Sequence, residues 1–310
     1  MRIAFMGTPD FSVACLKALV ESKHEIVGVF CQPDKPVGRK QIMTPPDVKV
    51  EALKHDLKIF QPVSLRNGKG VEILEEIKPD LVVVVAYGKI LPKEFLDYPK
   101  YGCINVHASI LPKYRGASPI HFAVLNGDEI TGVTVQQMDE GVDTGDILRT
   151  ETISIGINDT TEYMYEVLAP LGAKAMLDTI DLIEKGQLEP VKQDEALATH
   201  VGLLSREISN IDWNSSAFEI HNKIRGLYSW PGASTVLSGK TLKLHTSVLS
   251  DKKGNNIPGE VIEASDKLIV ACGDNCCIEI TELQLEGKKR MLSSAFLNGY
   301  KIDKGTVLGI

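Results

Sequence analysis

The sequence predicts an α/β protein in which a doubly wound parallel sheet is followed by a small β-barrel. Two observations predict the sheet. Strand-like and helix-like segments alternate up to about residue 189, and residues 81–86, LVVVVA, form an apolar run typical of a strand buried on both faces. A third observation predicts the barrel: after residue 230 the chain breaks into short alternating segments separated by Gly and Asn. We therefore expect domains at 1–189 and 206–310, joined by a linker at 190–205.

The opening of the chain predicts a Rossmann-like arrangement. Residues 2–6 indicate a strand, residues 7–10 a turn, and the apolar positions between 11 and 20 follow the period of a helix. The turn reads GTPDFS rather than GxGxxG, which disfavours a nucleotide cofactor at this point. The elements expected next are strand 25–30, helix 46–55, strand 58–61, helix 69–76, strand 81–86, strand 103–106, helix 120–125, strand 132–138 and helix 160–185.

Residues 31–49, CQPDKPVGRKQIMTPPDVK, interrupt this alternation. They contain four prolines and one glycine, together with the basic residues Lys35, Arg39, Lys40 and Lys49. Such a composition predicts an irregular surface loop. A loop of this length inside a compact domain is more often functional than an ordinary connection.

Composition and charge limit the possible partners. The net charge is −7, and residues 190–310 hold as many basic as acidic side chains, so no general basic surface is predicted. If the protein binds RNA, local groups of cations must supply the contacts. No apolar run approaches the roughly 20 residues needed to span a bilayer. The residues that follow Met1 already read as a core strand, which leaves no room for a signal peptide.

The six cysteines, at 15, 31, 103, 272, 276 and 277, lack the paired CxxC spacing of a zinc site. We therefore expect no metal and a reduced, cytoplasmic protein. The expected oligomeric state is a monomer.

Polar residues stand close together in the stretch 101–146. Asn105 and His107 are two apart on a predicted strand, so their side chains share a face. Residues 139–146, DEGVDTGD, place four acids in eight positions after the next predicted strand. Each feature alone is compatible with a satisfied core residue or a solvated turn. Because open α/β sheets bind ligands at the carboxyl ends of their strands, we expect an amide, an imidazole and a carboxylate to converge there.

Four segments carry a resemblance to a known family. NVHASILPKYRGASPI (105–120), DEGVDTGDIL (139–148), MGTPDF (6–11) and IRGLYSWPGA (224–233) resemble the folate-dependent formyltransferases over essentially the whole chain. The resemblance implies 10-formyltetrahydrofolate as formyl donor and catalytic roles for Asn105, His107 and Asp143. It also implies a folate-binding turn at Ser109, Ile110, Leu111 and Pro112. Weaker candidates for the pterin pocket are Lys89, Ile90, Leu91 and the backbone of Asp139, Glu140, Gly141 and Val142.

These residue types suit formyl transfer. An amine that attacks a formamide-like carbon produces a tetrahedral oxyanion, and a proton must pass from the amine to the leaving nitrogen. Asn105 can donate a hydrogen bond to the oxyanion, and His107 can do so when cationic. Asp143 can favour the cationic form of His107 or relay a proton through water.

The segment 224–233 and the proline-rich loop resemble the branch of the family that acts on methionyl initiator tRNA. This resemblance implies tRNA contacts from the loop and from scattered cations: Lys35, Arg39, Lys40, Arg115, Arg206, Lys223, Arg225, Lys240 and Lys243. Trp230 is interpreted as a core anchor rather than as a platform for base stacking. Two alternatives stay open, namely a formyltransferase acting on an amino sugar nucleotide and a non-catalytic RNA- or nucleotide-binding protein.

Overall fold

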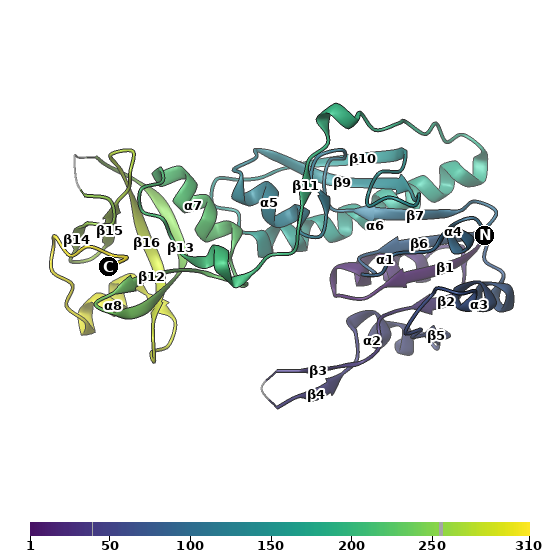
Figure 1. Cartoon of the computed structure of the whole chain (residues 1–310), viewed down its shortest axis with the longest axis horizontal. Helices are drawn as coiled ribbons and strands as arrows, with labels where there is room; N and C mark the ends of the chain where they lie inside the picture. The colour runs from purple at the N-terminus through teal and green to yellow at the C-terminus, as the bar shows by residue number, and fades with distance from the viewer. Residues whose placement is uncertain (39, 254–256) are drawn as a thin grey trace. The chain divides into compact units, whose positions relative to one another are not determined.

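The computed structural model describes residues 1–38, 40–253 and 257–310 (Figure 1). Its contacts divide the chain into two compact units. The first contains residues 1–116, 131–153 and 165–201, and the second contains residues 117–130, 154–164 and 202–310. Residues 117–130 and 154–164 therefore pack within the second unit, and residues 190–201 pack within the first. The chain crosses between the units more often than a single linker at 190–205 would require.

A seven-stranded sheet forms the centre of the first unit, counted over the described residues, with the order β10-β9-β7-β6-β1-β2-β5. The strands from β7 to β5 are parallel, which confirms the predicted α/β sheet. β9 runs antiparallel to β7, and β10 was not predicted. The strands are β1 (Arg2–Gly7), β2 (Glu25–Phe30), β5 (Ile59–Phe60), β6 (Leu81–Val85), β7 (Cys103–His107), β9 (Ile130–Gln137) and β10 (Ile147–Ser154).

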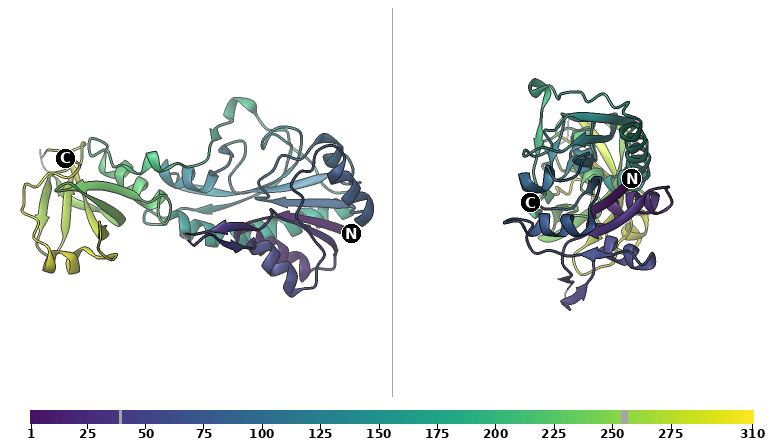
Figure 2. Two further views of the ribbon diagram at one scale, coloured as in Figure 1. Left: turned by 60° about the horizontal axis from the view of Figure 1, so that its bottom comes forward. Right: turned by 90° about the vertical axis from the view of Figure 1, so that its right-hand side faces the viewer.

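Helices cover both faces of this sheet (Figure 2). Met6 of β1 packs in one cluster with Leu74 and Phe95, which belong to α3 and α4. On the opposite face, Gly172 of α6 lies so close to Val106 that an added Cβ would come within 3.0 Å of it. The first unit contains α1 (Phe11–Val20), α2 (Asp47–Lys54), α3 (Lys69–Ile77), α4 (Lys93–Leu96) and most of α6 (Thr161–Lys185).

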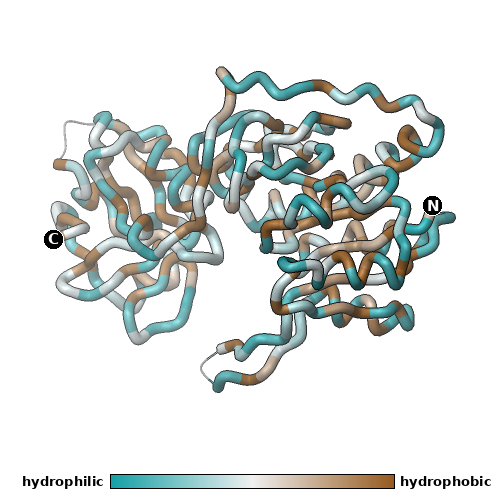
Figure 3. The backbone as a smooth tube through the Cα atoms, turned by 45° about the vertical axis from the view of Figure 1, so that its right-hand side comes forward, coloured by the Kyte–Doolittle hydropathy of each residue, from teal (hydrophilic) through white to brown (hydrophobic). Residues whose placement is uncertain are grey.

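All five residues of β6 are buried, as the run of branched apolar residues predicts. Figure 3 shows hydrophobic segments of the backbone in brown and hydrophilic ones in teal. Burial on both faces fixes this strand in the middle of the sheet, next to β7, whose end carries Asn105 and His107.

The prediction of an irregular loop at 31–49 is wrong. β3 (Lys35–Val37) pairs antiparallel with β4 (Ile42–Thr44), and α2 begins at Asp47. A two-stranded ribbon consists of edge strands, which tolerate Pro36 because an edge amide needs no ladder partner. Gly38, with φ +71°, opens the turn. Three apolar side chains on this hairpin are exposed by 56–61%, namely Val37, Ile42 and Met43.

The second unit is built on an antiparallel sheet with the strand order β12-β13-β16-β15-β14, and β17 pairs with β16. The C-terminal residues bond to both outer strands: Gly309 N donates to Val236 O of β12, and Val261 N of β14 donates to Thr306 O. These strands confirm the predicted all-β part. They are β12 (Ala233–Leu237), β13 (Lys240–Lys253), β14 (Val261–Ala264), β15 (Leu268–Ala271), β16 (Cys276–Leu285) and β17 (Met291–Leu292).

The core of the second unit includes α7 (Ala217–Gly226), which begins with a capping box formed by Ser216 and Glu219. The unit also contains α8 (Ser293–Gly299). Trp213 is 5% exposed, and its indole N–H donates to Thr235 Oγ1 at 3.0 Å. Trp230 is 48% exposed, so its interpretation as a core anchor is wrong and Trp213 occupies that place.

Residues 117–130 and 154–164 join this unit by packing on α7. α5 (Pro119–Leu125) contacts α7 directly. The Nε2 of His221 donates to Ile157 O at 2.8 Å, because a carbonyl can only accept. The guanidinium of Arg225 donates to the carbonyls of Gly156 and Asp159. Over the ranges that the structure describes, no helix is long and apolar enough to cross a membrane.

The pKa of His121 on α5 generates a testable prediction. Burial lowers this pKa from 6.5 to about 4, so the unfolded chain binds a proton in a pH range where the folded chain does not. Stability is therefore fully present above pH 6.5 and falls as the pH drops towards 4, by at most about 1.4 kcal/mol per pH unit for one group.

Both tryptophans, Trp213 and Trp230, lie in this unit, so urea unfolding followed by fluorescence reports its stability. The substitution His121→Gln should reduce the stability lost between pH 7 and pH 5. His200→Gln, at an exposed position, is the control and should leave that loss unchanged. Equal losses in wild type and His121→Gln would show that His121 is not the responsible group.

Candidate active site

The end of β7 groups polar side chains on one face of the sheet. Asn105 lies opposite Val84 of β6 and opposite Gln136 of β9, while His107 lies opposite Thr134. Since paired residues of neighbouring strands point to the same face, these side chains stand together, and Val106 points to the other face. The strand alternation predicted for Asn105 and His107 therefore produces a polar group extending over β7 and β9.

Asp143 reaches this group by a route that the sequence did not predict. β9 runs antiparallel to β7, so its last residue, Gln137, lies beside Ile104 near the start of β7. The loop 138–146 doubles back and brings Asp143 to Asn105. Gly145 makes this reversal possible, because a Cβ there would stand 1.6 Å from Gln137 O. The convergence expected at the carboxyl ends of parallel strands is thus produced by a reversed loop instead.

The Asp143 carboxylate accepts hydrogen bonds from three donors. Oδ1 accepts from Gln136 Nε2 at 2.8 Å and from Asn105 Nδ2 at 3.3 Å, and Oδ2 accepts from Gly116 N at 2.9 Å. Oδ2 also lies 3.5 Å from His107 Nδ1. The side chains of Asp143 and His107 are only 14% and 6% exposed. The carboxylate is therefore fixed in position by protein donors with little contact with solvent.

The hydrogen bonds of His107 fix the position of one proton. Nε2 is 2.9 Å from Tyr114 O, and because a carbonyl can only accept, Nε2 must carry a hydrogen. Nδ1 then faces the carboxylate oxygen of Asp143. Two acceptors attract each other only when a proton lies between them, as an imidazolium with a carboxylate or as a neutral imidazole with a carboxylic acid. The two atoms are thus placed so that a proton can lie between Nδ1 and Oδ2.

The turn after β7 is tightly held. Ser109 Oγ donates to Lys113 O at 2.6 Å, and Thr134 Oγ1 donates to Ser109 O and accepts from Leu111 N. Ser109 is fully buried and Leu111 is 4% exposed. The Ser109 hydroxyl and the Leu111 side chain are thus used inside the turn, and folate binding by the turn stays a prediction. Ile110 and Pro112 are half-buried.

Two cations expected to contact tRNA are buried. Arg115, in β8 (Arg115–Gly116), is 1% exposed and donates to Gln193 and Glu195. The hydrogen bond to the Glu195 carboxylate raises the pKa of Arg115. Arg225 is 4% exposed, and burial lowers its pKa. Since both guanidiniums are enclosed by protein acceptors, the prediction that they contact tRNA is wrong.

The other predicted cations differ in exposure. Lys223 is half-buried and donates to Asn210 O at 2.5 Å, while burial lowers its pKa. Arg39 lies outside the described residues. The remaining predicted cations are exposed: Lys35, Lys40, Arg206, Lys240 and Lys243.

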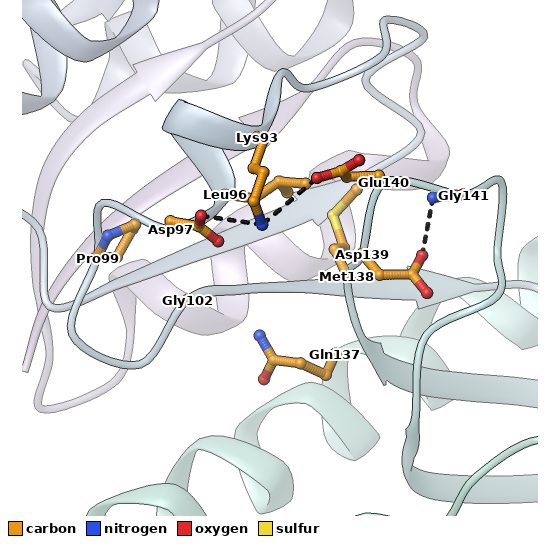
Figure 4. Close-up of a pocket in the computed structure, with 10 residues that line it drawn as sticks. All are labelled: Lys93, Leu96, Asp97, Pro99, Gly102, Gln137, Met138, Asp139, Glu140 and Gly141. Carbon is orange, nitrogen blue, oxygen red and sulfur yellow. Dashed lines mark hydrogen bonds and ion pairs between the residues drawn. The ribbon is translucent and has the colours of Figure 1, made fainter.

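A cavity of about 520 Å³ lies next to the loop that carries Asp143 (Figure 4). Lys93 Nζ bridges two acids across it, with Asp97 Oδ2 at 3.2 Å and Glu140 Oε1 at 3.4 Å. Gly141 N donates to Asp139 Oδ1 at 3.0 Å. The lining residues are Lys93, Leu96, Asp97, Pro99, Gly102, Gln137, Met138, Asp139, Glu140 and Gly141.

Three of the predicted donor-binding residues line this cavity, namely Asp139, Glu140 and Gly141. The others do not. Lys89 Nζ donates to Pro62 O and Val63 O, and Leu91 is 4% exposed. Ile90 and Val142 have exposed side chains, at 69% and 58%. The turn Ser109–Pro112 is not part of the lining either.

One group among the described residues has the spacing of metal ligands: His24, Asp181 and Glu184. Lys23 pairs with both acids, at 3.1 and 2.9 Å, and the Met1 amine lies 3.2 Å from Glu184. The carboxylates are thus already paired with cations, and we assign no metal to this group.

Sequence reasoning missed Gln136, Gly116 and Gln193, all of which hold Asp143. Gln136 would follow from strand alternation if the pairing of β9 with β7 were known. Gly116 lies inside the recognised motif, but its contact depends on the fold of the loop. Gln193 is 50 residues away from Asp143 in a stretch without a pattern.

Gly116→Ala tests how tightly this loop is built. Gly116 has φ +113°, and a Cβ would lie 2.1 Å from Val201 O in β11 (His200–Val201), which pairs with β8. We expect the variant to lose about 2 kcal/mol or more of stability, seen as a lowered melting temperature by calorimetry. Gly202→Ala is the matched control, because nothing lies within 4 Å of its Cβ position. Identical melting of both variants would contradict this geometry.

Comparison with known proteins identifies the family. The family described as "Formyl transferase" matches residues 1–180, and "Formyl transferase, C-terminal domain" matches residues 203–301. A methionyl-tRNA formyltransferase of Alkaliphilus oremlandii is 46% identical over all of both chains. One from Geotalea daltonii is 47% identical over 100% of this chain and 98% of its own, and one from Bacillus cytotoxicus is 45% identical over 100% and 99%.

Solved structures show the same fold. The sugar 3N-formyl transferase WlaRD superposes with a TM-score of 0.70 at 23% identity, over 93% of this chain and 99% of that one. An N-formyltransferase from Helicobacter canadensis gives 0.70 at 22% identity, over 90% and 98%. The sequence relatives are much closer than these structures and match from end to end. The chain therefore belongs to the formyl transferase family, among its methionyl-tRNA formyltransferases.

Proposed function

We propose that this protein transfers the formyl group of 10-formyltetrahydrofolate to the α-amino group of methionyl initiator tRNA, giving formylmethionyl-tRNA and tetrahydrofolate. Full-length similarity to methionyl-tRNA formyltransferases supports the substrates. The observation that carries the chemistry is the contact of one carboxylate, Asp143, with both Asn105 and His107.

Asn105 is proposed to stabilise the oxyanion. Attack of the amine on the formyl carbon puts negative charge on the formyl oxygen, and a fixed N–H donor lowers the energy of that state. One Nδ2 hydrogen of Asn105 is directed at Asp143, which locks the orientation of the amide, and the second is available for the substrate oxygen. A donor of this kind typically contributes about 10²–10³ in rate.

His107 and Asp143 are proposed to move the proton. When the amine forms its new bond to the formyl carbon, its nitrogen becomes positively charged and must lose a proton. When the bond from that carbon to the folate N10 breaks, N10 must gain one. We propose that Nδ1 and Oδ2 share one proton, that the Asp143 carboxylate accepts the proton released by the amine, and that the pair then passes one proton to N10. The hydrogen on Nε2 stays there throughout and is donated to Tyr114 O.

We assign the ring system of the donor to the cavity lined by Asp139, Glu140 and Gly141. Its volume of about 520 Å³ is within the range of small-molecule sites. The same loop carries Asp143 two residues further on, so a donor held there has its one-carbon group close to the catalytic residues. Ile90, Val142 and Pro112 remain proposed contacts for the rest of the donor.

The acceptor tRNA is proposed to bind through local cations. The net charge of −7 excludes a general positive field, so phosphate contacts must come from individual exposed side chains. The candidates are Lys35 and Lys40 at the β3–β4 hairpin and Arg206, Lys240 and Lys243 of the second unit. Arg39 remains a candidate on its sequence position alone.

Substituting the catalytic residues should abolish turnover without unfolding the protein. We expect Asp143→Asn and His107→Ala to lower kcat for formyl transfer by at least about 10², since each removes the shared proton. Asp146→Asn, an acid of the same loop, is the control and should stay within about threefold of wild type. Melting temperatures measured alongside separate catalysis from folding. Loss of the melting transition together with activity would point to structural roles.

The substrate assay itself distinguishes the alternatives. The formyl donor is offered with methionyl initiator tRNA and, separately, with an amino sugar nucleotide. We expect formylation of the tRNA only. Formylation of the sugar alone would replace the proposed acceptor, and binding of tRNA without any transfer would favour a non-catalytic protein.

Salt should affect the two substrates differently. A few phosphate contacts imply a log-log slope of about −0.7 to −0.9 per contact for tRNA affinity, so KM for tRNA should rise with salt while KM for the donor stays nearly constant. The double variant Lys35→Ala/Lys40→Ala should reduce the magnitude of that slope by the amount expected for about two phosphate contacts. Lys185→Ala with Lys192→Ala, both at exposed positions outside the hairpin, is the charge-matched control. An unchanged slope would remove the hairpin from the interface.

A further inference from the structure

We infer that Gln193 is a positioning residue that sets the geometry of the His107–Asp143 pair, and that residues 193–201 form a strap over the catalytic loops. This inference rests on the proposed function for its kinetic test only. Residues 190–205 had been expected to serve as a linker, yet 193–201 make side-chain and backbone contacts with the two segments that hold the pair.

Gln193 connects a buried cation to the backbone of Asp143. Its Oε1 accepts from Arg115 Nε at 3.0 Å and from Arg115 Nη2 at 2.9 Å. Its Nε2 donates to Asp143 O at 2.9 Å and to Gly145 O at 2.7 Å. Both ends of one amide are therefore fully used, and they tie the reversed loop to β8. Asp143 adopts φ +55°, a conformation that non-glycine residues avoid unless contacts impose it.

The rest of the strap holds the other side of the pair. Thr199 Oγ1 accepts from Tyr114 N at 2.8 Å, and Thr199 O accepts from Arg115 N at 2.8 Å. Tyr114 O in turn accepts from His107, and Gly116 N donates to Asp143. Each partner of the catalytic pair is thus held by a residue that the strap fixes. Displacing the strap would change the separation of Nδ1 and Oδ2.

The chemistry of the contacts requires an amide at position 193. Arg115 is 1% exposed and needs acceptors, which Gln193 and a bidentate Glu195 supply. The carbonyls of Asp143 and Gly145 need donors, and the Nε2 of Gln193 is the donor in both contacts. In Gln193→Glu, one carboxylate oxygen would still accept from Arg115. The other oxygen would face the carbonyls of Asp143 and Gly145, and two acceptors cannot form a hydrogen bond.

Gln193→Glu therefore separates positioning from simple packing. We expect kcat for formyl transfer to fall by about 10-fold or more, with KM for both substrates within about twofold, because the substituted residue contacts neither substrate. Lys192→Ala, at an exposed neighbour in the same stretch, should leave both constants unchanged. If Gln193→Glu does not give a folded protein, Gln193→Met, which has similar length and neither set of hydrogen bonds, is measured in the same way.

A double-mutant cycle shows whether Gln193 acts through Asp143. In the Asp143→Asn background, Gln193→Glu should lower kcat by less than about twofold, since the group it positions is gone. Effects that multiply in the double variant would mean a general structural role and overturn the inference. An unchanged kcat in the Gln193→Glu single variant would overturn it as well.

Hydrogen exchange supplies a readout independent of activity. In Gln193→Glu, peptides covering 114–118 and 143–146 should exchange faster than in wild type, because the bond from Gly116 N to Asp143 is loosened, while Lys192→Ala should match wild type. Unchanged exchange in Gln193→Glu would overturn the inference whether or not tRNA is the acceptor. If the wild-type protein fails to formylate methionyl-tRNA, the proposed function is contradicted. The hydrogen-exchange result then decides the inference about Gln193 by itself.

Discussion

The Asp143 carboxylate is the point on which the arrangement of the site depends. It accepts from Gln136, Asn105 and Gly116, and it faces the imidazole nitrogen of His107. Three donors from separate segments of the chain hold it at one position with little exposure to solvent. Low exposure strengthens each of these interactions and makes an unpaired charge costly, so the contacts must all be present together. The reversal of loop 138–146, the glycines at 116 and 145 and the buried Arg115 all help to bring these contacts together.

The central strands of the sheet and residues 193–201 both hold the segments that contact that carboxylate. The buried strand β6 fixes β7, and β7 and β9 present the polar face. Residues 193–201 then tie the turn after β7 to the loop after β9. The buried guanidinium of Arg115 takes part in these contacts. It carries five N–H donors and can therefore orient several acceptors at once. The contacts that hold Asp143 and His107 therefore extend to a segment without any recognisable motif.

Local sequence patterns predicted those features that depend on neighbouring residues alone. The run Leu81–Val85 could only be a buried strand, and the spacing of Asn105 and His107 placed both side chains on one face. The motif resemblance identified Asp143, although the expected route through parallel strands was wrong. Patterns failed where distant residues decide the outcome. The hairpin β3–β4 depends on cross-strand pairing that prolines obscure, Arg115 is buried by Glu195, and Gln193 becomes important only through contacts 50 and 78 residues away.

The central claim is that His107 carries a fixed proton on Nε2 and directs Nδ1 at Asp143. Nitrogen-15 NMR of protein labelled at histidine, with His107→Gln to assign the resonances, measures the protonation of each ring nitrogen directly. The account predicts that Nε2 of His107 stays protonated throughout the pH range in which the protein is folded, and that only the Nδ1 signal responds to Asp143→Asn. A neutral His107 with its proton on Nδ1 and an unprotonated Nε2 would contradict the account.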